Sequence, residues 1–458
     1  MNAFRLRVAL LFVALSAATA CEAATWVYDS KIPLAQHLDN QRFGTTVAAD
    51  LYPNGTIRAL YVGSPNSTVS FEAGGTFPAA GIVYALSPIG GWHIREILHR
   101  DNPVANDHFG ASLAVHHGVI VVGAPDADIG FPVDAGSVTV FLDQFYNHPE
   151  INPEPAITNP IGFFPGEFAG GHFGKSVDID GDGLAAGVGS FVAIGAPNVL
   201  TDGAVYVYHV EEQTSNSLVG LDYGSNAGSL GASVAINATS GSTFVLAAGA
   251  PGVTENGQAL AGEAYLYVPI SGGLTKFETL KALNPAFADA FGGSVAIDEA
   301  GHVYVGATGR QKSAGVRTGS VTLFKPSGLF SYALDIELFP STGAANGDLC
   351  GASISLNRSG DDSGVFAIGC PSFDGLVTNE GAVRVFRTVN VGGSDLWFQT
   401  RLDMADYAHG ADDIGRSVAF GLQHIYAGAP LADSFGATNN GTVQVFSVDR
   451  IFADGFEN

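Results

Sequence analysis

His108-Phe109-Gly110-Ala111-Ser112-Leu113-Ala114-Val115 opens the stretch of sequence that decides the fold. It continues through His116-His117-Gly118, an apolar run over 119–122, Gly123-Ala124-Pro125 and, after a polar loop, Gly136-Ser137-Val138-Thr139-Val140-Phe141. Short apolar runs between glycine turns are typical of strands, and a proline belongs at a strand end because it cannot donate to a ladder. The third run alternates like a half-buried strand. The stretch therefore predicts three strands, and we expect a fourth, weakly marked strand before the next Phe-Gly pair.

The same pattern occurs seven times along the chain. Successive repeats are 66, 64, 57, 61, 59 and 64 residues apart, measured between the glycines of the Phe-Gly-like pairs, which are Gly44, Gly110, Gly174, Gly231, Gly292, Gly351 and Gly415. The third runs begin at Gly81, Gly136, Gly203, Gly262, Gly319, Gly381 and Gly441. A near-constant period indicates one supersecondary unit copied many times. Four antiparallel strands per unit predict an all-β fold, a seven-bladed β-propeller.

The tryptophans indicate how the ring closes. Trp26, Trp92 and Trp397 each lie 18 residues before a repeat glycine. The segment before the first repeat therefore resembles the last strand of a blade, which the seventh repeat lacks after Phe446. Because an open array would expose strand edges, we expect residues 24–28 to pair with the strand that ends at Phe446 and so complete the last blade.

One small hydroxyl residue follows each repeat glycine by two positions: Thr46, Ser112, Ser176, Ser233, Ser294, Ser353 and Ser417. These side chains could line a channel that binds a polar ligand. Alternatively, small residues are required where the innermost strands converge, and each hydroxyl bonds to a neighbour's backbone. The second interpretation is favoured because an identical feature in every blade indicates architecture.

The pattern resembles the FG-GAP repeat of integrin alpha-chain propellers and their bacterial relatives. The resemblance covers residues 26–446 and implies the propeller fold, but little about the ligand, because propellers serve unrelated functions. It also places calcium loops between the first two strands of a blade. Asp178-Ile179-Asp180-Gly181-Asp182-Gly183 has alternating carboxylates followed by glycine, as a calcium loop requires. Asp178, Asp180 and Asp182 are therefore the candidate Ca²⁺ ligands, although Ala186 replaces the acid that the family has at the ninth position; a solvated acidic turn is the alternative. Asp361-Asp362 is a weaker candidate.

The N-terminus is typical of an export signal. Arg5 and Arg7 precede an apolar run over 8–15, and small residues follow. The run is too short to span a membrane, and no second candidate span follows. We expect residues 1–23 to be a signal peptide, 24–446 the propeller and 447–458 a C-terminal tail. Cleavage before Cys21 would instead leave a lipid-anchored protein.

The remaining cysteines predict a disulfide. Cys350 and Cys370 replace the Phe of the Phe-Gly pair and the Ala of the Gly-Ala-Pro triplet in one blade. The start of the first strand should lie opposite the end of the second, so the two cysteines should face each other and pair in an oxidising compartment. Two buried free thiols are the alternative.

The sequence favours a binding protein over an enzyme. Formal net charge is −24, which disfavours nucleic acid as a partner. His108, His116, His117 and His172 form no recognisable metal or catalytic set with acids along the sequence. We expect an exported, non-catalytic, monomeric recognition or adhesion module of a Gram-negative bacterium, secreted, periplasmic or on the cell surface, that binds protein or glycan through rim loops. Asn147 to His172, whose Phe163 and Phe164 we expect to be exposed, is the best candidate contact loop; packing of this segment over a blade like a lid is the alternative. A polysaccharide lyase or hydrolase acting at the axial mouth, or a purely structural envelope protein, are the alternatives.

Overall fold

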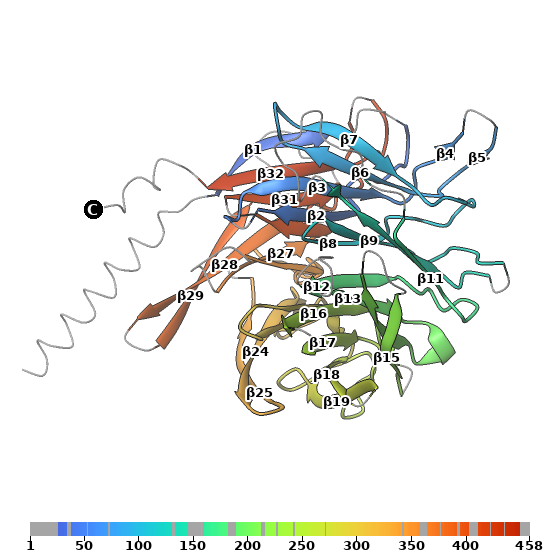
Figure 1. Cartoon of the computed structure of the whole chain (residues 1–458). Coiled ribbons are helices and arrows are strands. Elements are labelled where there is room, and N and C mark those ends of the chain that lie inside the picture. Colours follow the sequence, from blue (N-terminus) through green and yellow to red (C-terminus); the bar gives the residue numbers. More distant parts are fainter. Residues whose placement is uncertain are drawn as a thin grey trace, which may run out of the picture.

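The structure is a computed structural model of the whole chain (Figure 1). It describes residues 26–448 apart from residues 34–37, 53, 72–73, 131–132, 145–156, 158–159, 182–188, 212–215, 226–227, 241–242, 271, 341–342, 358–363, 376, 392–393, 403–410, 422 and 435. The predicted signal peptide, Cys21 and the tail 449–458 lie outside the described residues, as do Asp182, Asp361 and Asp362.

The described strands form seven four-stranded antiparallel sheets, which confirms the predicted propeller. Blade 1 contains β2 (Thr46–Leu51), β3 (Ile57–Ser64), β6 (Ile82–Ser87) and β7 (His93–Leu98), and blade 2 contains β8 (Ser112–His116), β9 (Val119–Ala124), β10 (Ser137–Leu142) and β11 (Gly162–Pro165). Blade 3 contains β12 (Ser176–Gly181), β13 (Ser190–Ala196), β14 (Ala204–Val210) and β15 (Ser217–Tyr223), and blade 4 contains β16 (Ser233–Ser240), β17 (Thr243–Ala250), β18 (Glu263–Ile270) and β19 (Gly273–Leu280).

The other three blades follow the same order from the axis outwards. Blade 5 contains β20 (Phe291–Ile297), β21 (Val303–Ala307), β24 (Ser320–Gly328) and β25 (Ser331–Leu338), and blade 6 contains β26 (Ser353–Leu356), β27 (Val365–Cys370), β28 (Ala382–Val391) and β29 (Ser394–Leu402). Blade 7 contains β30 (Ser417–Phe420), β31 (His424–Ala429), β32 (Thr442–Val448) and β1 (Trp26–Pro33). Two short ribbons, β4–β5 (Val69–Ser70, Thr76–Phe77) and β22–β23 (Gln311–Ser313, Val316–Arg317), and the 3₁₀ turn η2 (Val199–Thr201) lie in loops.

The N-terminal strand closes the ring, as the tryptophan spacing predicts. β1 pairs antiparallel with β32, from Trp26 opposite Val448 to Pro33 opposite Thr442. In Figure 1 the blue β1 lies beside the red β32, although the two segments come from opposite ends of the described chain. The ring is thereby held by a main-chain ladder that joins the ends of the chain.

The Phe-Gly pair ties each blade to the one before it. Phe173 forms a parallel bridge with Gly136, which immediately precedes β10 of blade 2, while the Phe173 ring packs edge-on against Tyr206 of its own blade at 5.1 Å between ring centroids. The following Gly174 has φ +88°, a conformation that favours glycine. The motif recurs because one residue must serve two neighbouring blades.

The predicted hydroxyl ring is architectural. Each hydroxyl donates to the carbonyl of the repeat glycine in the next blade, over 2.6–3.0 Å, and Ser417 closes the circle by donating to Gly44. The glycine of each Gly-Ala-Pro-like triplet packs against the same carbonyl; a Cβ on Gly123, for example, would overlap the oxygen of Gly174. The small residues therefore permit a close backbone approach at all seven interfaces, as the sequence predicts.

Apolar cores fill the spaces between blades. Seven clusters of buried residues are found, and each joins two adjacent blades. The cluster between blades 7 and 1 includes Ile32 of β1, so the closing strand contributes to the core as well as to the ladder. Burial between neighbours is how a repeat protein of this length avoids a single large core.

Cys350 and Cys370 form a disulfide, as predicted, with both residues fully buried between blades 5 and 6. No helix in the described part of the chain is long and apolar enough to span a bilayer.

Candidate functional site

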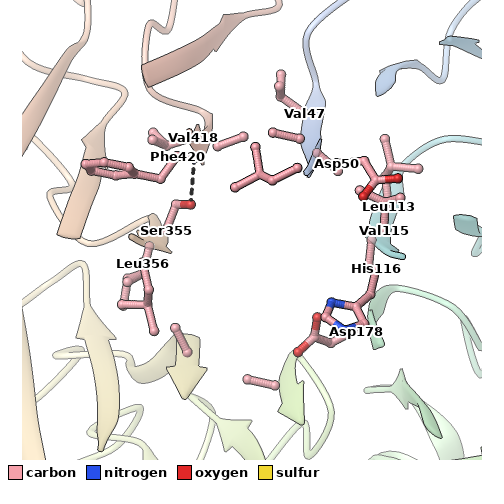
Figure 2. A pocket seen from close by; sticks show the side chains of 18 of the residues that line it. Val47, Asp50, Leu113, Val115, His116, Asp178, Ser355, Leu356, Val418 and Phe420 are labelled. Carbon is pink, nitrogen blue, oxygen red and sulfur yellow. Dashed lines mark hydrogen bonds between the residues drawn. The ribbon is translucent and has the colours of Figure 1, made fainter. Parts of the chain in front are cut away.

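A cavity of about 490 Å³ lies on the axis of the ring, where the innermost strands of all seven blades contribute to its wall (Figure 2). Most of the wall is small and apolar, as at Val47, Ala114, Val234 and Val418. The wall contains no member of the hydroxyl ring, because those hydroxyls bond to neighbouring blades. The cavity is therefore not the plain Ser/Thr-lined channel that a symmetric ring would produce.

One position of this wall breaks the seven-fold pattern. Two residues after each ring hydroxyl, five blades carry alanine, blade 6 carries Ser355 and blade 3 carries Asp178. Asp178 Oδ2 accepts a hydrogen bond from Ile236 N of blade 4 over 2.8 Å, and Ser355 Oγ accepts one from Phe420 N of blade 7 over 3.0 Å. Both side chains thus accept from an amide of the next innermost strand at equivalent positions. Only Asp178 adds charge there.

The predicted calcium ligands Asp178 and Asp180 lie on β12 rather than in a loop. Asp180 Oδ2 accepts from Ala238 N over 2.7 Å, so both carboxylates are bonded to β16 of the next blade. Asp182, the third predicted ligand, lies outside the described residues. Among the residues that are described, no group of three or more His, Cys, Asp or Glu side chains is arranged to hold a metal. The calcium site stays a prediction.

Two histidines line the cavity beside these acids. His116 Nε2 lies 3.4 Å from Asp180 Oδ1 in the neighbouring blade. The rings of His116 and His117 lie 4.0 Å apart, because His117 has φ +48° and the chain turns there. Figure 2 shows His116 and Asp178 together on one side of the cavity, facing Leu356 across it. Sequence spacing could not reveal this group, because its histidines and its acids are more than sixty residues apart.

A buried ionic network links blades 1 and 2 behind the cavity wall. Arg58, whose side chain is 0 % exposed, is paired with Asp50 and lies 3.2 Å from Asp143, which also pairs with Arg95. Asp50, which faces the cavity, also accepts from Gly118 N over 3.0 Å. Burial raises the pKa of Asp143, but its contacts with Arg95 and Arg58 outweigh burial and leave that pKa lowered. The network is neutral in sum, with two arginines and two aspartates.

A second candidate surface is the upper rim of the ring. At this rim the first strand of each blade begins and the second strand ends. There the loop 281–290 is held by two arginines from blade 5. Arg310 donates to the carbonyls of Leu283 and Asn284 and pairs with Asp289 at 2.7 Å. Burial disfavours the charged form of Arg310, but Glu337 and Asp289 outweigh burial and raise its pKa, so the guanidinium stays charged.

The second arginine fixes the tip of the same loop. Arg317 donates to the carbonyls of Phe287 (2.6 Å), Ala288 (3.1 Å) and Gly309 (2.6 Å). With its carbonyls held, the loop presents the side chains of Leu283, 59 % exposed, and Phe287, 56 % exposed, to solvent.

Neighbouring loops extend this apolar surface to blades 4 and 6. The carbonyl of Leu260 accepts from Ala290 N, and Arg317 N donates to Asn346 Oδ1 in the loop before Cys350. The exposed large apolar residues on these connected loops, hereafter the rim patch, are Leu260, Leu283, Phe287 and Leu349. The sequence drew attention to long loops, whereas this patch is built on short loops braced by arginine.

The predicted contact loop Asn147 to His172 is only partly a loop. Its residues 162–165 are β11, the fourth strand of blade 2. Phe163 is 47 % exposed, with Arg100 5.9 Å from its ring, but Phe164 is 5 % exposed and packs on Tyr208 at 4.3 Å. The expectation that both rings are exposed is wrong for Phe164, because alternate residues of a strand point to opposite faces. Residues 147–156 lie outside the described part.

Sequence reasoning also missed an acid between two histidines. Asp126, which follows the blade 2 triplet, lies 2.6 Å from His108 Nδ1 and 2.7 Å from His172 Nδ1. Burial raises the pKa of Asp126, but the two histidines outweigh burial and leave the pKa lowered. The signal was present, since both histidines immediately precede Phe-Gly pairs and therefore occupy equivalent places in adjacent blades. The cluster joins blades 2 and 3 at the upper rim.

Comparison with known proteins supports the repeat assignment. The family model described as FG-GAP repeat matches residues 92–141, which extend from the start of β7 to the third strand of blade 2. The matched segment thus contains one Phe-Gly pair, one Gly-Ala-Pro triplet and one third strand. No curated protein matches the chain.

Proposed function

The chain belongs to the FG-GAP β-propeller family, and we propose that it is an exported, non-catalytic recognition module that binds a protein partner through the rim patch. The observation that carries the proposal is the loop 281–290, whose carbonyls are held by Arg310 and Arg317 while Leu283 and Phe287 face solvent. Large apolar side chains on a fixed backbone are the usual anchors of protein interfaces. Pre-organisation reduces the ordering cost of binding.

The composition of the patch favours protein over glycan as the partner. Its four residues are Leu and Phe, which contribute apolar area but no hydrogen-bonding group. A sugar, whose surface is dense in hydroxyls, would leave those groups unsatisfied against such a surface. The formal net charge of −24 favours a partner segment with basic residues around its apolar anchor.

The proposal also includes export of the protein and calcium binding in blade 3. The buried disulfide and the FG-GAP fold are typical of extracellular proteins. The signal-like N-terminus is consistent with export. A calcium ion at Asp178, Asp180 and Asp182 would brace blade 3 without taking part in binding at the rim patch, which lies on blades 4 to 6.

One observation at the axial cavity favours the alternative hypothesis that the protein is an enzyme. His116, Asp178 and Asp180 form an asymmetric group at the axis, which an acid–base mechanism would need. Against it, Oδ2 of each aspartate accepts a main-chain hydrogen bond from blade 4, which suits a structural role.

The binding proposal is tested by selecting a random peptide library on the purified protein, with a glycan array screened in parallel. Enriched peptides should bind at least tenfold more weakly to the Leu283→Asp/Phe287→Asp variant, because two desolvated anchors are replaced by charge. The matched control is Ile270→Asp/Leu329→Asp. These residues are also exposed and lie at hairpin turns of blades 4 and 5, at the opposite rim.

The affinity of the enriched peptides for the Ile270→Asp/Leu329→Asp control should stay within twofold of their affinity for the wild type. Peptides that bind the rim-patch variant as well as the wild type, or glycan binding that survives both variants, would contradict the proposed surface.

A further inference from the structure

We propose that the lower rim of the ring docks on a lipid bilayer with zwitterionic headgroups, through apolar side chains at the tips of its outer hairpins. At the lower rim the third strand of each blade ends and the fourth begins, opposite the rim patch, so this inference does not depend on the proposed function. The tips belong to β6–β7, β18–β19 and β24–β25. Their large apolar residues are exposed: Ile89 by 54 %, Ile270 by 48 %, Leu329 by 88 % and Phe330 by 50 %.

The tip in blade 5 holds its apolar residues on a strained turn. Gly328 pairs with Ser331, so Leu329 and Phe330 alone form the loop. Phe330 has φ +58°, a conformation that suits glycine and is unusual for a bulky residue. The Phe330 ring lies 5.4 Å from that of Phe277 in blade 4, between centroids, whereas almost nothing covers Leu329. Exposed apolar side chains on a strained turn indicate a surface that binds.

The arrangement of the tips suits a flat partner. Equivalent hairpins point to one face of the ring, and blades 1 and 5 lie on different sides of its axis. Figure 1 shows β7 and β25 at opposite ends of the molecule. An anchor in a protein interface requires a pocket on the partner. A bilayer meets all the tips at once and takes up apolar side chains at the boundary between headgroups and acyl chains.

The tips carry no charge. Residues 87–92, 270–273 and 328–331 contain no acidic or basic side chain. With histidine counted as neutral, the nearest charged residues along these hairpins are basic: Arg95, Lys276 and Lys325. Two of the three are paired with acids of the ring, so they add little positive potential. The formal net charge of −24 repels anionic headgroups, and we therefore expect a zwitterionic surface.

The chain also enters the ring at the lower rim. Trp26 begins β1 and pairs with Val448, at the end of the third strand of blade 7. Cys21 precedes Trp26 by five residues, which span at most about 18 Å. If cleavage leaves Cys21 as a lipid anchor, the tether would hold the lower rim, and not the rim patch, against the bilayer.

The test is co-sedimentation of the mature protein that starts at Ala24, and so carries no acyl chain, with vesicles of phosphatidylcholine or of phosphatidylglycerol. We expect a partition constant of at least about 10³ M⁻¹ for phosphatidylcholine, below the value of about 10⁴ M⁻¹ that a single myristoyl chain gives. Binding to phosphatidylglycerol should be at least about fivefold weaker, because both surfaces are negative.

Two variants locate the contact. Leu329→Ser/Phe330→Gly removes both apolar side chains and places glycine at the positive φ, so the turn keeps its backbone. Its partition constant should fall at least about tenfold. The control, Leu283→Asp/Phe287→Asp, alters the rim patch at the other face and should stay within about twofold of the wild type. Far-UV circular dichroism checks that both variants are folded.

Three results would overturn the proposal: no vesicle binding by the wild type, equal binding by Leu329→Ser/Phe330→Gly, or an equal loss in the rim-patch variant. A preference for phosphatidylglycerol would contradict the zwitterionic surface. Peptides that lose affinity for Leu329→Ser/Phe330→Gly, while vesicles bind that variant like the wild type, would assign the tips to a protein partner instead.

Discussion

Replacing Arg58 by methionine should destabilise the propeller more than any substitution in the hydroxyl ring. The Arg58 side chain is fully buried between Asp50, 3 % exposed, and Asp143, 0 % exposed. Methionine fills part of the same volume but carries no charge. The neutral network of two arginines and two aspartates would become a buried group with one uncompensated negative charge.

The magnitude follows from that imbalance. Breaking a buried ion pair by removing one partner costs about 3–5 kcal/mol, because the remaining charge stays desolvated. By comparison, loss of one hydroxyl bond, such as Ser112 to Gly174, costs about 1–3 kcal/mol, including the carbonyl left without its donor. At about 2.1 cal/mol/K per residue, this chain has an unfolding entropy of about 0.9 kcal/mol/K. A loss of about 4 kcal/mol therefore lowers Tm by about 4–5 °C.

The assay is thermal unfolding followed by far-UV circular dichroism from pH 4 to pH 8, with Asp50→Asn/Arg58→Met as the matched control. The double variant removes the stranded charge of Asp50 and should recover part of the lost Tm. In the Arg58→Met single variant, protonation relieves the stranded charge, so its deficit against the wild type should shrink as pH falls from 7 towards 5.

The stability of the wild type should depend on pH in the opposite sense and fall as pH is lowered. The pKa of Asp143 is lowered in the folded state, so its contribution to stability is present above the unfolded pKa of about 3.9 and is lost as pH falls through the folded value. A Tm change below about 1 °C in the single variant, or a deficit that does not depend on pH, would refute the reasoning.

Two further predictions follow from the ring and from blade 3. Deleting residues 24–36 removes β1 and its ladder with β32, so the protein should aggregate or lose at least about 10 °C in Tm by scanning calorimetry; an unchanged Tm would disprove the closing role. If Asp178, Asp180 and Asp182 hold calcium, chelator-stripped protein should give a calorimetric signal on titration with Ca²⁺. Asp180→Asn should abolish this signal, whereas Asp298→Asn, at the equivalent position of blade 5, should not. A signal unchanged in Asp180→Asn would place the ion elsewhere, and no signal in the wild type would remove the calcium hypothesis.

The architecture could be predicted because the chain repeats its backbone requirements. Gly174 must adopt a positive φ, Gly123 must admit a neighbouring carbonyl, and Ser112 must supply a hydroxyl to it. Each requirement excludes most other residue types, so each leaves a mark in the sequence at every repeat. The disulfide was predictable for the same reason, since two departures from the pattern fell at positions that a hairpin places together.

The candidate sites could not be predicted in this way, because they depend on contacts between blades that spacing does not encode. Asp126 meets His108 and His172 from three segments. The sequence marks the two histidines by their equivalent places before Phe-Gly pairs, but it marks the acid between them only by its place after a triplet. The rim patch depends on Arg310 and Arg317 reaching across loops to main-chain carbonyls, which have no sequence signature. Phe163 and Phe164 cannot be distinguished in the sequence, but the pairing of β11 with β10 turns their side chains to opposite faces of the sheet.

Departures from the seven-fold pattern differ in what they require of their surroundings. Cys350 and Cys370 account for each other through a disulfide, and Arg58 is balanced by Asp50 and Asp143. At the position of Asp178, the interfaces that carry alanine close equally well, although alanine has no side-chain acceptor for the next amide. The hydrogen bond from Ile236 N fixes the orientation of the Asp178 carboxylate. Because Asp178→Asn keeps an oxygen for that amide and removes only the charge, it separates the effect of the charge from that of the hydrogen bond, which no substitution in the symmetric ring can do.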